Sequence, residues 1–401
     1  MTARPLVGWY VHHHGAGHRT RFSAVRPQLD ADVVVFSSLA APADLPDDTT
    51  WVELERDDTA TTGADGVVRH PADASPTVGG LLHWAPVAHP GHTARLGRIA
   101  AAVAGAAADG RPFDAMVVDV SVEVTVFARL LGVEVVVVSQ PGDRTDEPHR
   151  LAYDAASRVI APWPAGTHDS SALDRVAPKV RWVGGISRQD GRLAAADVPA
   201  AAGAPAAAAG PSSTVVPGSV LFVGGAGGTD HDDLAASLAR AARATPGTTW
   251  TTLGVDRWVD DPWAEMATAE VIVTWAGQNT VADLAALGAR AVVVPQTRPF
   301  DEQLTTASAL DRAGLAVVAT SWPADDEWPA LIDRARGLRP DWSAWQVEGA
   351  AARAAAVVAE VAGRGVGHDV GPGSARPAGH RVAQDPSAAQ PTPTTLTGAL
   401  S

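Results

Sequence analysis

Residues 271–318 constrain the fold of this 401-residue chain more than any other stretch, because short apolar runs alternate there with helix-like segments. The runs at 271–274 and 291–294 are rich in valine, as buried strands commonly are. Between them, apolar residues recur at helical spacing up to Leu287, and Gly288 closes that helix. Strands that alternate with helices predict an α/β fold, in which a parallel sheet carries helices on both faces.

Two polar clusters follow the strands of this stretch. The first opens the helix and consists of Gly277, Gln278, Asn279 and Thr280. The second follows a proline-bounded loop and consists of Asp301, Glu302 and Gln303. Ligands of open α/β sheets bind beyond the carboxyl ends of the strands, and a helix N-terminus suits an anion. Carboxylates and amides suit hydroxyl groups, so the two clusters together suggest a sugar nucleotide.

A glycine-rich loop precedes these clusters. It follows an apolar run at 219–223, which predicts the first strand of this half, and it leads into a helix near Asp232. The loop contains Gly225, Ala226, Gly227 and Gly228. Bare backbone N–H groups beside a helix N-terminus can hold a phosphate. The loop is not a P-loop, because no Lys-Ser/Thr pair follows it, and it lacks the third glycine of a dinucleotide fingerprint.

The N-terminal half begins with a similar arrangement. An apolar run at 6–11 predicts a strand, and Gly15 and Gly17 permit a tight turn and the close approach of a ligand at its end. His18 then starts a helix and faces the predicted cleft. A neutral imidazole in this position can take a proton from an attacking hydroxyl. His14 is the second candidate for this base, and a histidine that only caps the helix or packs is the open alternative.

Other residues of this half also suggest chemistry. The run His12-His13-His14 suggests a metal site, but neighbouring strand residues point to opposite faces and no carboxylate has ligand spacing, so we expect no metal. Asp119 ends a buried strand, and Glu123 follows one helical turn later. The pair can bind an acceptor hydroxyl or a cation, or can cap the helix. We favour capping for Glu123 and keep Asp119 as a catalytic candidate.

The stretch 271–318 resembles the C-terminal half of two-domain nucleotide-sugar glycosyltransferases, above all the family of the lipid-linked N-acetylglucosaminyltransferase of peptidoglycan synthesis, with its glycosyltransferase family 28 C-terminal domain. That pattern is a Gly-x-x-Thr-x-x-acidic segment, a strand ending in proline, an Asp-x-Gln loop and a helix ending in Ala-Gly. The matching positions are Gly277, Thr280, Asp283, Pro295, Asp301, Gln303, Ala313 and Gly314. The resemblance implies the GT-B fold, with two doubly wound Rossmann-like domains facing a cleft.

The resemblance also implies roles for donor-site residues. Trp258 and Val259 would border the nucleobase, Asp283 would bind the ribose, and Glu302 and Gln303 would meet the sugar hydroxyls. The relatives have a glutamate in place of Asp283 and an amide in place of Glu302, which leaves the ribose contact and the sugar open. At 120–123 they carry a glycine-rich loop for a diphospholipid acceptor. This chain has Val-Ser-Val-Glu instead, which argues against such an acceptor.

Composition suggests the domain organisation. We expect an acceptor-binding Rossmann-like domain at 1–186, an Ala/Pro-rich linker at 187–217, a nucleotide-sugar-binding Rossmann-like domain at 218–362 and a disordered tail at 363–401. The Ala-rich stretch 342–362 predicts one or two helices that close the second domain and pack back on the first. The formal net charge of −14 disfavours nucleic acid and anionic membranes as partners. There is no cysteine, no apolar run long enough for a bilayer span and no signal-peptide pattern, so we expect a cytoplasmic enzyme with at most peripheral membrane association. The oligomeric state stays open.

The function expected from these features is transfer of a hexose or N-acetylhexosamine from a nucleotide-diphosphate sugar, expected to be UDP-linked, to a hydroxyl acceptor. Both partners are small molecules, and neither a metal nor a cofactor is expected. One alternative is a UDP-sugar 2-epimerase of the same fold, which would use carboxylates such as Asp119, Glu123 and Glu302 and would turn over without an acceptor. The other alternative is a non-catalytic sugar-nucleotide-binding protein.

Overall fold

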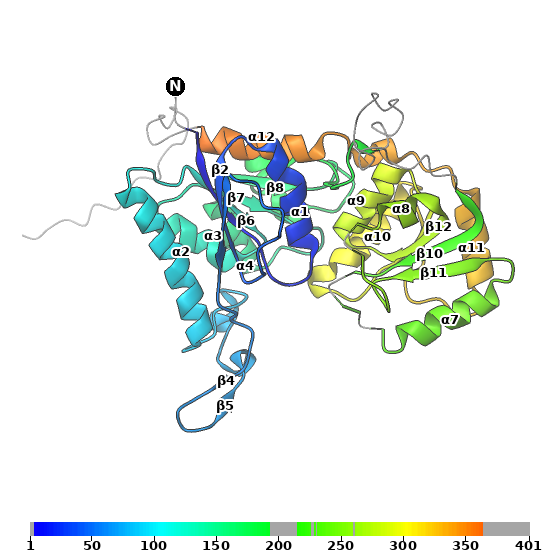
Figure 1. Ribbon diagram of the computed structural model, residues 1–401, viewed down its shortest axis with the longest axis horizontal. Helices are drawn as coiled ribbons and strands as arrows, with labels where there is room; N and C mark the ends of the chain where they lie inside the picture. Colours follow the sequence, from blue (N-terminus) through cyan, green and yellow to red (C-terminus); the bar gives the residue numbers. More distant parts are fainter. Residues whose placement is uncertain (1–3, 193–214, 226–227, 230, 260, 364–401) are drawn as a thin grey trace, which may run out of the picture. The chain divides into compact units, whose positions relative to one another are not determined.

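The computed structural model describes residues 4–192, 215–225, 228–229, 231–259 and 261–363 (Figure 1). Ala226 and Gly227 of the predicted donor loop lie outside the described residues. So do most of the predicted linker, at 193–214, and the predicted tail from residue 364 onward.

The N-terminal half contains a seven-stranded sheet with the order β3-β2-β1-β6-β7-β8-β9, and every neighbouring pair is parallel. The strands are β1 (Leu6–Tyr10), β2 (Asp32–Ser37), β3 (Thr49–Glu53), β6 (Ala115–Asp119), β7 (Val135–Val138), β8 (Arg158–Ala161) and β9 (Val180–Trp182). The central strands β6 and β7 are buried along their whole length, as expected for a parallel sheet covered on both faces. A small antiparallel hairpin, β4 (Thr61–Thr62) and β5 (Val68–Arg69), lies apart from this sheet.

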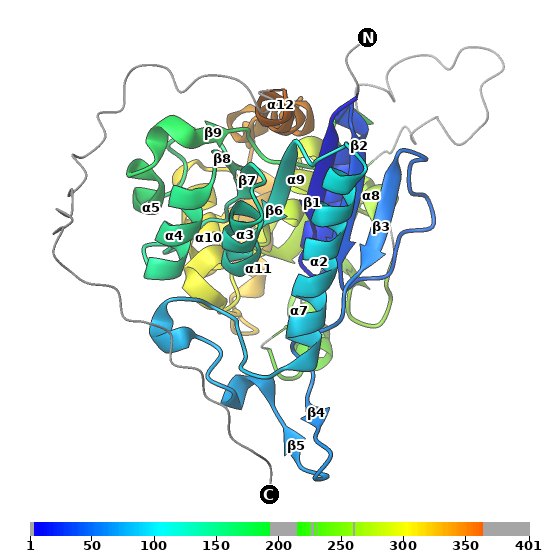
Figure 2. The same cartoon turned by 90° about the vertical axis from the view of Figure 1, so that its left-hand side faces the viewer.

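Helices cover both faces of the first sheet. They are α1 (Gly17–Val25), α2 (Pro90–Ala108), α3 (Val122–Leu130), α4 (Glu147–Ala155), α5 (Ser171–Asp174) and α12 (Ala350–Ala362). Figure 2 shows α2, α3 and α4 in front of the strands, where they share one apolar core. The apolar residues of α1 and α12 belong to a second core with β1, β2 and β6.

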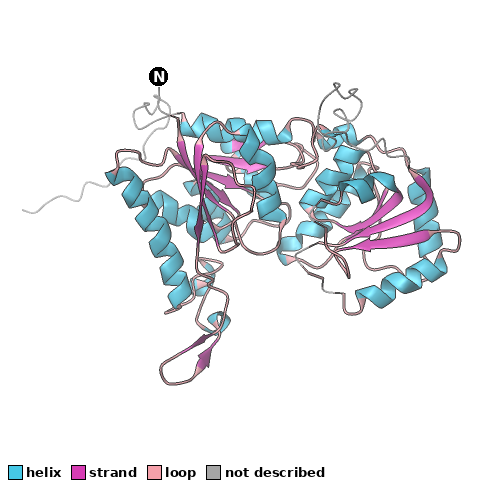
Figure 3. Ribbon diagram, in the orientation of Figure 1, coloured by secondary structure: helices cyan, strands magenta, loops and turns pink. Residues whose placement is uncertain are grey.

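The C-terminal half contains a five-stranded parallel sheet with the order β11-β10-β12-β13-β14. Its strands are β10 (Val216–Val223), β11 (Thr249–Leu253), β12 (Ala269–Trp275), β13 (Ala291–Val294) and β14 (Val317–Val318). Its helices are α7 (Leu234–Ala244), α8 (Trp263–Thr268), α9 (Gln278–Leu287), α10 (Glu302–Arg312) and α11 (Trp328–Gly337). Short 3₁₀ segments are η1 (Arg26–Gln28), η2 (Pro71–Asp73), η3 (Val78–Gly80), η4 (Ala177–Lys179), η5 (Pro299–Asp301) and η6 (Trp342–Trp345). Figure 3 shows the strands and the helices around them.

The strand orders place a topological switch point in each sheet. Strand β1 lies between β2 and β6, and β10 lies between β11 and β12, so the chain direction across the sheet reverses at these pairs. Crevices for ligands form where the loops leave two such strands in opposite directions. The loops after β1 and β10 are the two glycine-containing loops that the sequence singled out.

The prediction of two doubly wound parallel sheets is confirmed. The last helix, α12, packs on the first sheet, as expected of a helix that packs back on the first domain. Small side chains such as Ala354, followed by Val358 and Val361, form the buried face that lies close to the strands. The boundaries predicted at residues 186 and 218 stay predictions. Within the described ranges, no helix combines the length and apolar character that crossing a bilayer requires.

Candidate active site

A pocket of about 1770 Å³ is lined by loops that follow the carboxyl ends of strands in both sheets. The predicted donor residues that line it are Gly225, Gly228, Trp258, Val259, Gly277, Gln278, Asn279, Thr280, Asp283, Glu302 and Gln303. The predicted acceptor-side residues that line it are His14, Gly15, Gly17 and His18. The structure therefore brings nearly all described candidates to one site. Asp119 and Asp301 do not line the pocket, and both are discussed below.

His18 and Asp119 form a histidine–carboxylate pair at the first switch point. His18 lies in the first turn of α1, and Asp119 is the last residue of β6 and is fully buried. The Nδ1 atom of His18 lies 3.0 Å from Oδ1 of Asp119. A carboxylate in this position favours the imidazole tautomer with its proton on Nδ1, which leaves Nε2 to accept a proton from a ligand in the pocket. Asp119 is thus placed to orient the histidine and does not reach the pocket itself.

Arg21 completes this pair. It lies one helical turn after His18, is buried, and donates from Nη1 to the same oxygen of Asp119 at 2.6 Å. Burial alone would raise the pKa of the Asp119 carboxyl, but Arg21 and His18 outweigh that effect and hold this pKa below its usual value. Asp119 is therefore ionised at neutral pH and can stabilise a protonated His18.

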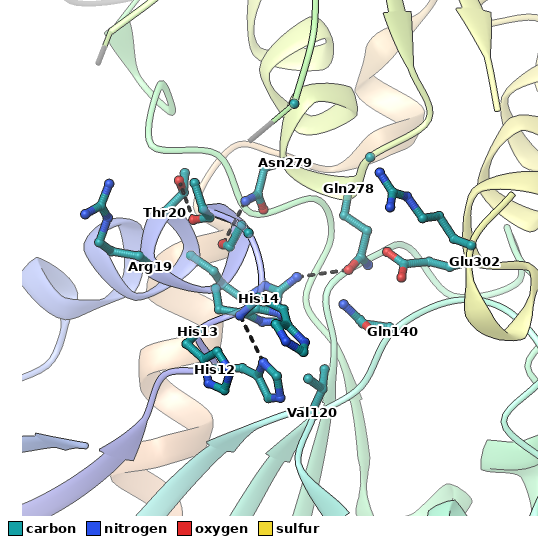
Figure 4. Close-up of a pocket in the computed structure, with 18 of the residues that line it drawn as sticks. His12, His13, His14, Arg19, Thr20, Val120, Gln140, Gln278, Asn279 and Glu302 are labelled. Carbon is teal, nitrogen blue, oxygen red and sulfur yellow. Dashed lines mark hydrogen bonds between the residues drawn. The ribbon is translucent and has the colours of Figure 1, made fainter. Parts of the chain in front are cut away.

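Two amide side chains of α9 contact the first half of the chain. Arg21 donates from Nη2 to Oε1 of Gln278 at 2.9 Å, and Asn279 donates from Nδ2 to the carbonyl of Gly17 at 2.8 Å. Figure 4 shows both bonds as dashed lines beside the histidine loop. Because Oε1 of Gln278 is occupied, its NH₂ group is the free end, and this buried nitrogen has no partner among the described residues. It can donate to a ligand oxygen.

The start of α9 and the glycine loop are open to an anion. In the described part of the chain, no side chain caps α9, so the N–H groups of its first turn have no capping partner there. A Cβ atom placed at Gly225 or Gly277 would meet no atom within 4 Å, so the space in front of these backbones is empty. Exposed N–H groups at a helix start and in a glycine loop are a common way to hold a phosphate.

The three histidines after β1 lie closer together than strand alternation predicts. The rings of His13 and His14 are 4.5 Å apart, and both Nε2 atoms lie 3.2 Å from Oδ2 of Asp58. Sequence spacing gave no sign of this carboxylate, because Asp58 arrives from a loop 44 residues later. A cation here would have to lie next to the Arg56 guanidinium, which donates two hydrogen bonds to the same carboxylate. That positive charge disfavours a metal ion.

His14 and His12 differ in their surroundings. The His14 side chain is 66% exposed, and within the described residues only Asp58 forms an ion pair with its ring. Burial and the neighbouring histidines lower the pKa of His12 well below its usual value, so this ring is neutral. His18 is the better placed candidate base, because it alone among them combines a buried carboxylate partner with a helical anchor.

Asp301, Glu302 and Gln303, the second polar cluster of the sequence, have different surroundings. The side-chain oxygen of Gln303 accepts hydrogen bonds from the backbone N–H groups of Ala276 and Gln296, at 3.2 and 3.0 Å, and so ties the ends of β12 and β13 together. Oε2 of Glu302 lies 3.6 Å from Nη2 of Arg144. Burial raises the pKa of the Glu302 carboxyl, although the positive charge of Arg144 opposes this shift. Asp301 was predicted to bind the donor, but it is exposed outside the pocket, with a positive φ of 54° just before α10.

Asp283 lies in α9 and is buried. Burial raises the pKa of its carboxyl to about 6, and the hydroxyl of Ser187, which donates to Oδ1 at 2.5 Å, partly opposes this shift. A buried carboxyl in the pocket wall suits a ligand hydroxyl better than a phosphate. Trp258, by contrast, is 55% exposed, which leaves its ring face free for a planar ligand.

Glu123, just after β6, binds the backbone of the loop that contains His83 and Trp84. The predicted capping role of Glu123 falls to Ser121, whose hydroxyl accepts from the N–H of Val124. Glu123 instead accepts hydrogen bonds from the backbone N–H groups of His83 and Trp84, at 2.7 and 2.9 Å. Val120 adopts a φ of 68°, which is unfavourable for a β-branched residue and is typical of functional loops. Asp119 and Glu123 both have fixed partners, which disfavours their use as the acid and base of an epimerase.

Sequence reasoning missed three residues of this site. Arg21 carries a usable signal, since it follows His18 by three positions on one helix face. Arg144 belongs to a polar loop that the sequence marks only as polar. Ser187 meets Asp283 from 96 positions away, and nothing in the local sequence indicates that contact.

Residues 251–322 match the model of the glycosyltransferase family 28 C-terminal domain. Comparison with curated proteins gives no match. Solved structures with the same fold include the glycosyltransferase of kitacinnamycin (15% identity, TM-score 0.55), covering 90% of this chain and 100% of that one. MurG from Acinetobacter baumannii is similar at 14% identity and a TM-score of 0.53, and the match covers 89% of this chain and 100% of MurG. A UDP-glucosyltransferase from Polygonum tinctorium is similar at 14% identity and a TM-score of 0.59, with 90% and 100% covered.

These findings confirm the GT-B fold, since the structural likeness extends over nearly the whole of each neighbour. The domain match adds the chemistry that fold alone does not carry, and it lies over the stretch from which the prediction was made. The chain is a nucleotide-sugar glycosyltransferase, as predicted. The narrower resemblance to the lipid-linked enzyme of peptidoglycan synthesis stays a prediction.

Proposed function

We propose that the chain transfers a hexose or N-acetylhexosamine from a UDP-linked sugar to a hydroxyl group of a small acceptor. The observation that carries the proposal is the His18–Asp119 pair, which faces the same pocket as the uncapped start of α9 and the glycine loop. One side of the pocket can thus activate a hydroxyl, and the other can bind a diphosphate.

The proposed reaction is a direct displacement at the anomeric carbon. The acceptor hydroxyl gives its proton to Nε2 of His18 as its oxygen forms the new bond to that carbon. The bond from the carbon to the diphosphate oxygen breaks, and the electron pair leaves with the diphosphate. Backbone N–H groups at Gly225, Gly228 and the start of α9, with the free amide of Gln278, then stabilise the leaving group.

Donor recognition follows from the other side chains of the second half. Trp258 and Val259 border the base, Asp283 meets the ribose, and Glu302 lies beside the sugar. Neither a metal nor a cofactor is required in this scheme, because N–H donors supply the stabilisation of the diphosphate.

The test is a thermal-shift screen followed by a transfer assay. UDP, GDP and dTDP are added separately, and a ligand at about 100 times its dissociation constant should stabilise the protein by about 2.7 kcal/mol. UDP is expected to shift the melting temperature most. If none of the three shifts it, the donor assignment is wrong. Turnover of a UDP-sugar to its epimer without any acceptor would instead favour the epimerase.

A further inference from the structure

A second histidine of the pocket is held as firmly as His18, although it lies in a loop. His83 belongs to the segment between β5 and α2, and Glu123 fixes its backbone N–H at 2.7 Å. The same carboxylate fixes the next residue, Trp84, whose indole N–H also donates to the carbonyl of Asp57 at 3.2 Å. These bonds hold the loop in place where it lines the pocket.

The His83 ring is oriented by Asp146. Its Nε2 atom lies 2.7 Å from Oδ2 of Asp146, and the other oxygen of that carboxylate lies 2.5 Å from Nδ1 of His149. Burial would raise the pKa of the Asp146 carboxyl, but the two histidines hold it below its usual value, so the group is charged. A charged carboxylate at Nε2 favours the tautomer that leaves a lone pair on Nδ1 of His83. Among the described residues, no polar atom bonds to that Nδ1.

A metal ion is a poorer occupant of this cluster than a hydroxyl group. His83, Asp146 and His149 could converge on one ion. However, the guanidinium of Arg144 lies 3.4 Å from Nε2 of His149 and stacks on Phe300 at 4.4 Å, so a positive charge already occupies the neighbourhood. A neutral hydrogen-bond donor meets no such repulsion.

Apolar side chains lie beside His83 as well as the charged cluster. Leu82 and Trp84, its neighbours in the chain, line the pocket, and the ring centroid of Phe300 lies 5.3 Å from that of His83. A hydrogen-bond acceptor beside apolar and aromatic side chains suits a hydroxyl on an apolar or aromatic body.

We propose that Nδ1 of His83, oriented by Asp146 on a loop fixed by Glu123, binds a second hydroxyl group of the acceptor. The acceptor is then an apolar or aromatic molecule with at least two hydroxyls, one for His18 and one for His83. The inference rests on the proposed transfer to an acceptor hydroxyl and adds the class of acceptor to it.

The test uses matched pairs of acceptors that differ in hydroxyl number, namely umbelliferone with esculetin and pterostilbene with resveratrol. Binding is measured by calorimetry on the full chain with UDP present at saturation. In the unaltered protein, the member with more hydroxyls should bind about 5- to 10-fold more tightly in at least one pair. His83→Phe should remove this preference and leave the binding of the one-hydroxyl member within about 2-fold. Asp146→Asn should reduce the preference, because the tautomer is no longer enforced.

His70→Ala is the matched control, because His70 is an exposed histidine of the same segment outside the pocket lining. It should leave the preference unchanged. The proposal is overturned if the unaltered protein shows no preference in either pair, or if the preference survives in His83→Phe. A UDP-dependent melting shift is recorded for each variant, so a failure of the donor site is distinguished from a failure of this inference.

Discussion

His18 and Arg21 share one oxygen of Asp119, at 3.0 and 2.6 Å, from the same face of α1. The carboxylate is fully buried at the end of the central strand β6, and the side chains of Arg21 and His18 beside it are also buried. This unit connects the candidate base to the donor side, since Arg21 also bonds to Gln278.

Replacing His18 by alanine should lower kcat by about 10²- to 10⁴-fold, because the acceptor loses its general base. UDP affinity, measured by melting shift, should change little. His14→Ala serves as the control, since His14 is largely exposed and should lose less than about 10-fold. A larger loss in His14→Ala than in His18→Ala would assign the base to His14.

Asp119→Asn should lower both stability and transfer. It leaves the buried charge of Arg21 uncompensated, which costs about 3–5 kcal/mol in the free energy of unfolding. The double variant with Arg21→Met removes that charge and should recover most of the stability in urea unfolding. Transfer should stay low in the double variant, because His18 still lacks its orienting carboxylate. Full activity in the double variant would refute the orienting role.

Asp283 should make stability depend on pH. Burial raises its pKa in the folded state from 3.8 to about 6, so between these values the folded state holds more protons than the unfolded state. The contribution of the protonated Asp283 carboxyl to the free energy of unfolding is fully present below pH 4. It is lost as the pH rises through about 6. Asp283→Asn keeps an acceptor for Ser187 and should be about 2–3 kcal/mol more stable than the unaltered protein at pH 7, with no gain at pH 4.

Two measurements on Asp283→Asn separate stability from function. Urea unfolding at several pH values gives the stability difference, and Asp174→Asn, at an exposed position, should show no such pH dependence. Calorimetry with UDP should show weaker binding by Asp283→Asn, because the amide replaces the carboxylate of the proposed ribose contact. Unchanged UDP affinity would remove Asp283 from the ribose site.

Gln303→Ala should lower the free energy of unfolding by about 2–5 kcal/mol, because two buried N–H groups at the ends of β12 and β13 lose their acceptor. Gln303→Glu keeps an acceptor oxygen, so its free energy of unfolding should fall less than that of Gln303→Ala. Hydrogen exchange at Ala276 and Gln296 gives a local readout of the same change. Equal protection of both amides in Gln303→Ala would show that the side chain does not hold these strand ends.

Much of the fold was predictable because it follows from local sequence patterns. Valine runs, helical spacing and glycine turns are local properties, and they identified the sheets and the loops after β1 and β10. The position of Asp301 also has a local side: its backbone has a positive φ before α10, and the residue does not line the pocket. No periodicity in the sequence reports such a turn at a non-glycine residue.

By itself, the amino-acid sequence determined that two parallel sheets would form and that His18, the glycine loop and the start of α9 would lie at strand ends. Only the tertiary structure decided which distant side chains meet there. Asp58 joins His13 and His14, and Asp119 joins Arg21. The physical reason is that parallel strands require long crossover connections, so the loops at one sheet edge come from widely separated segments whose contacts depend on packing.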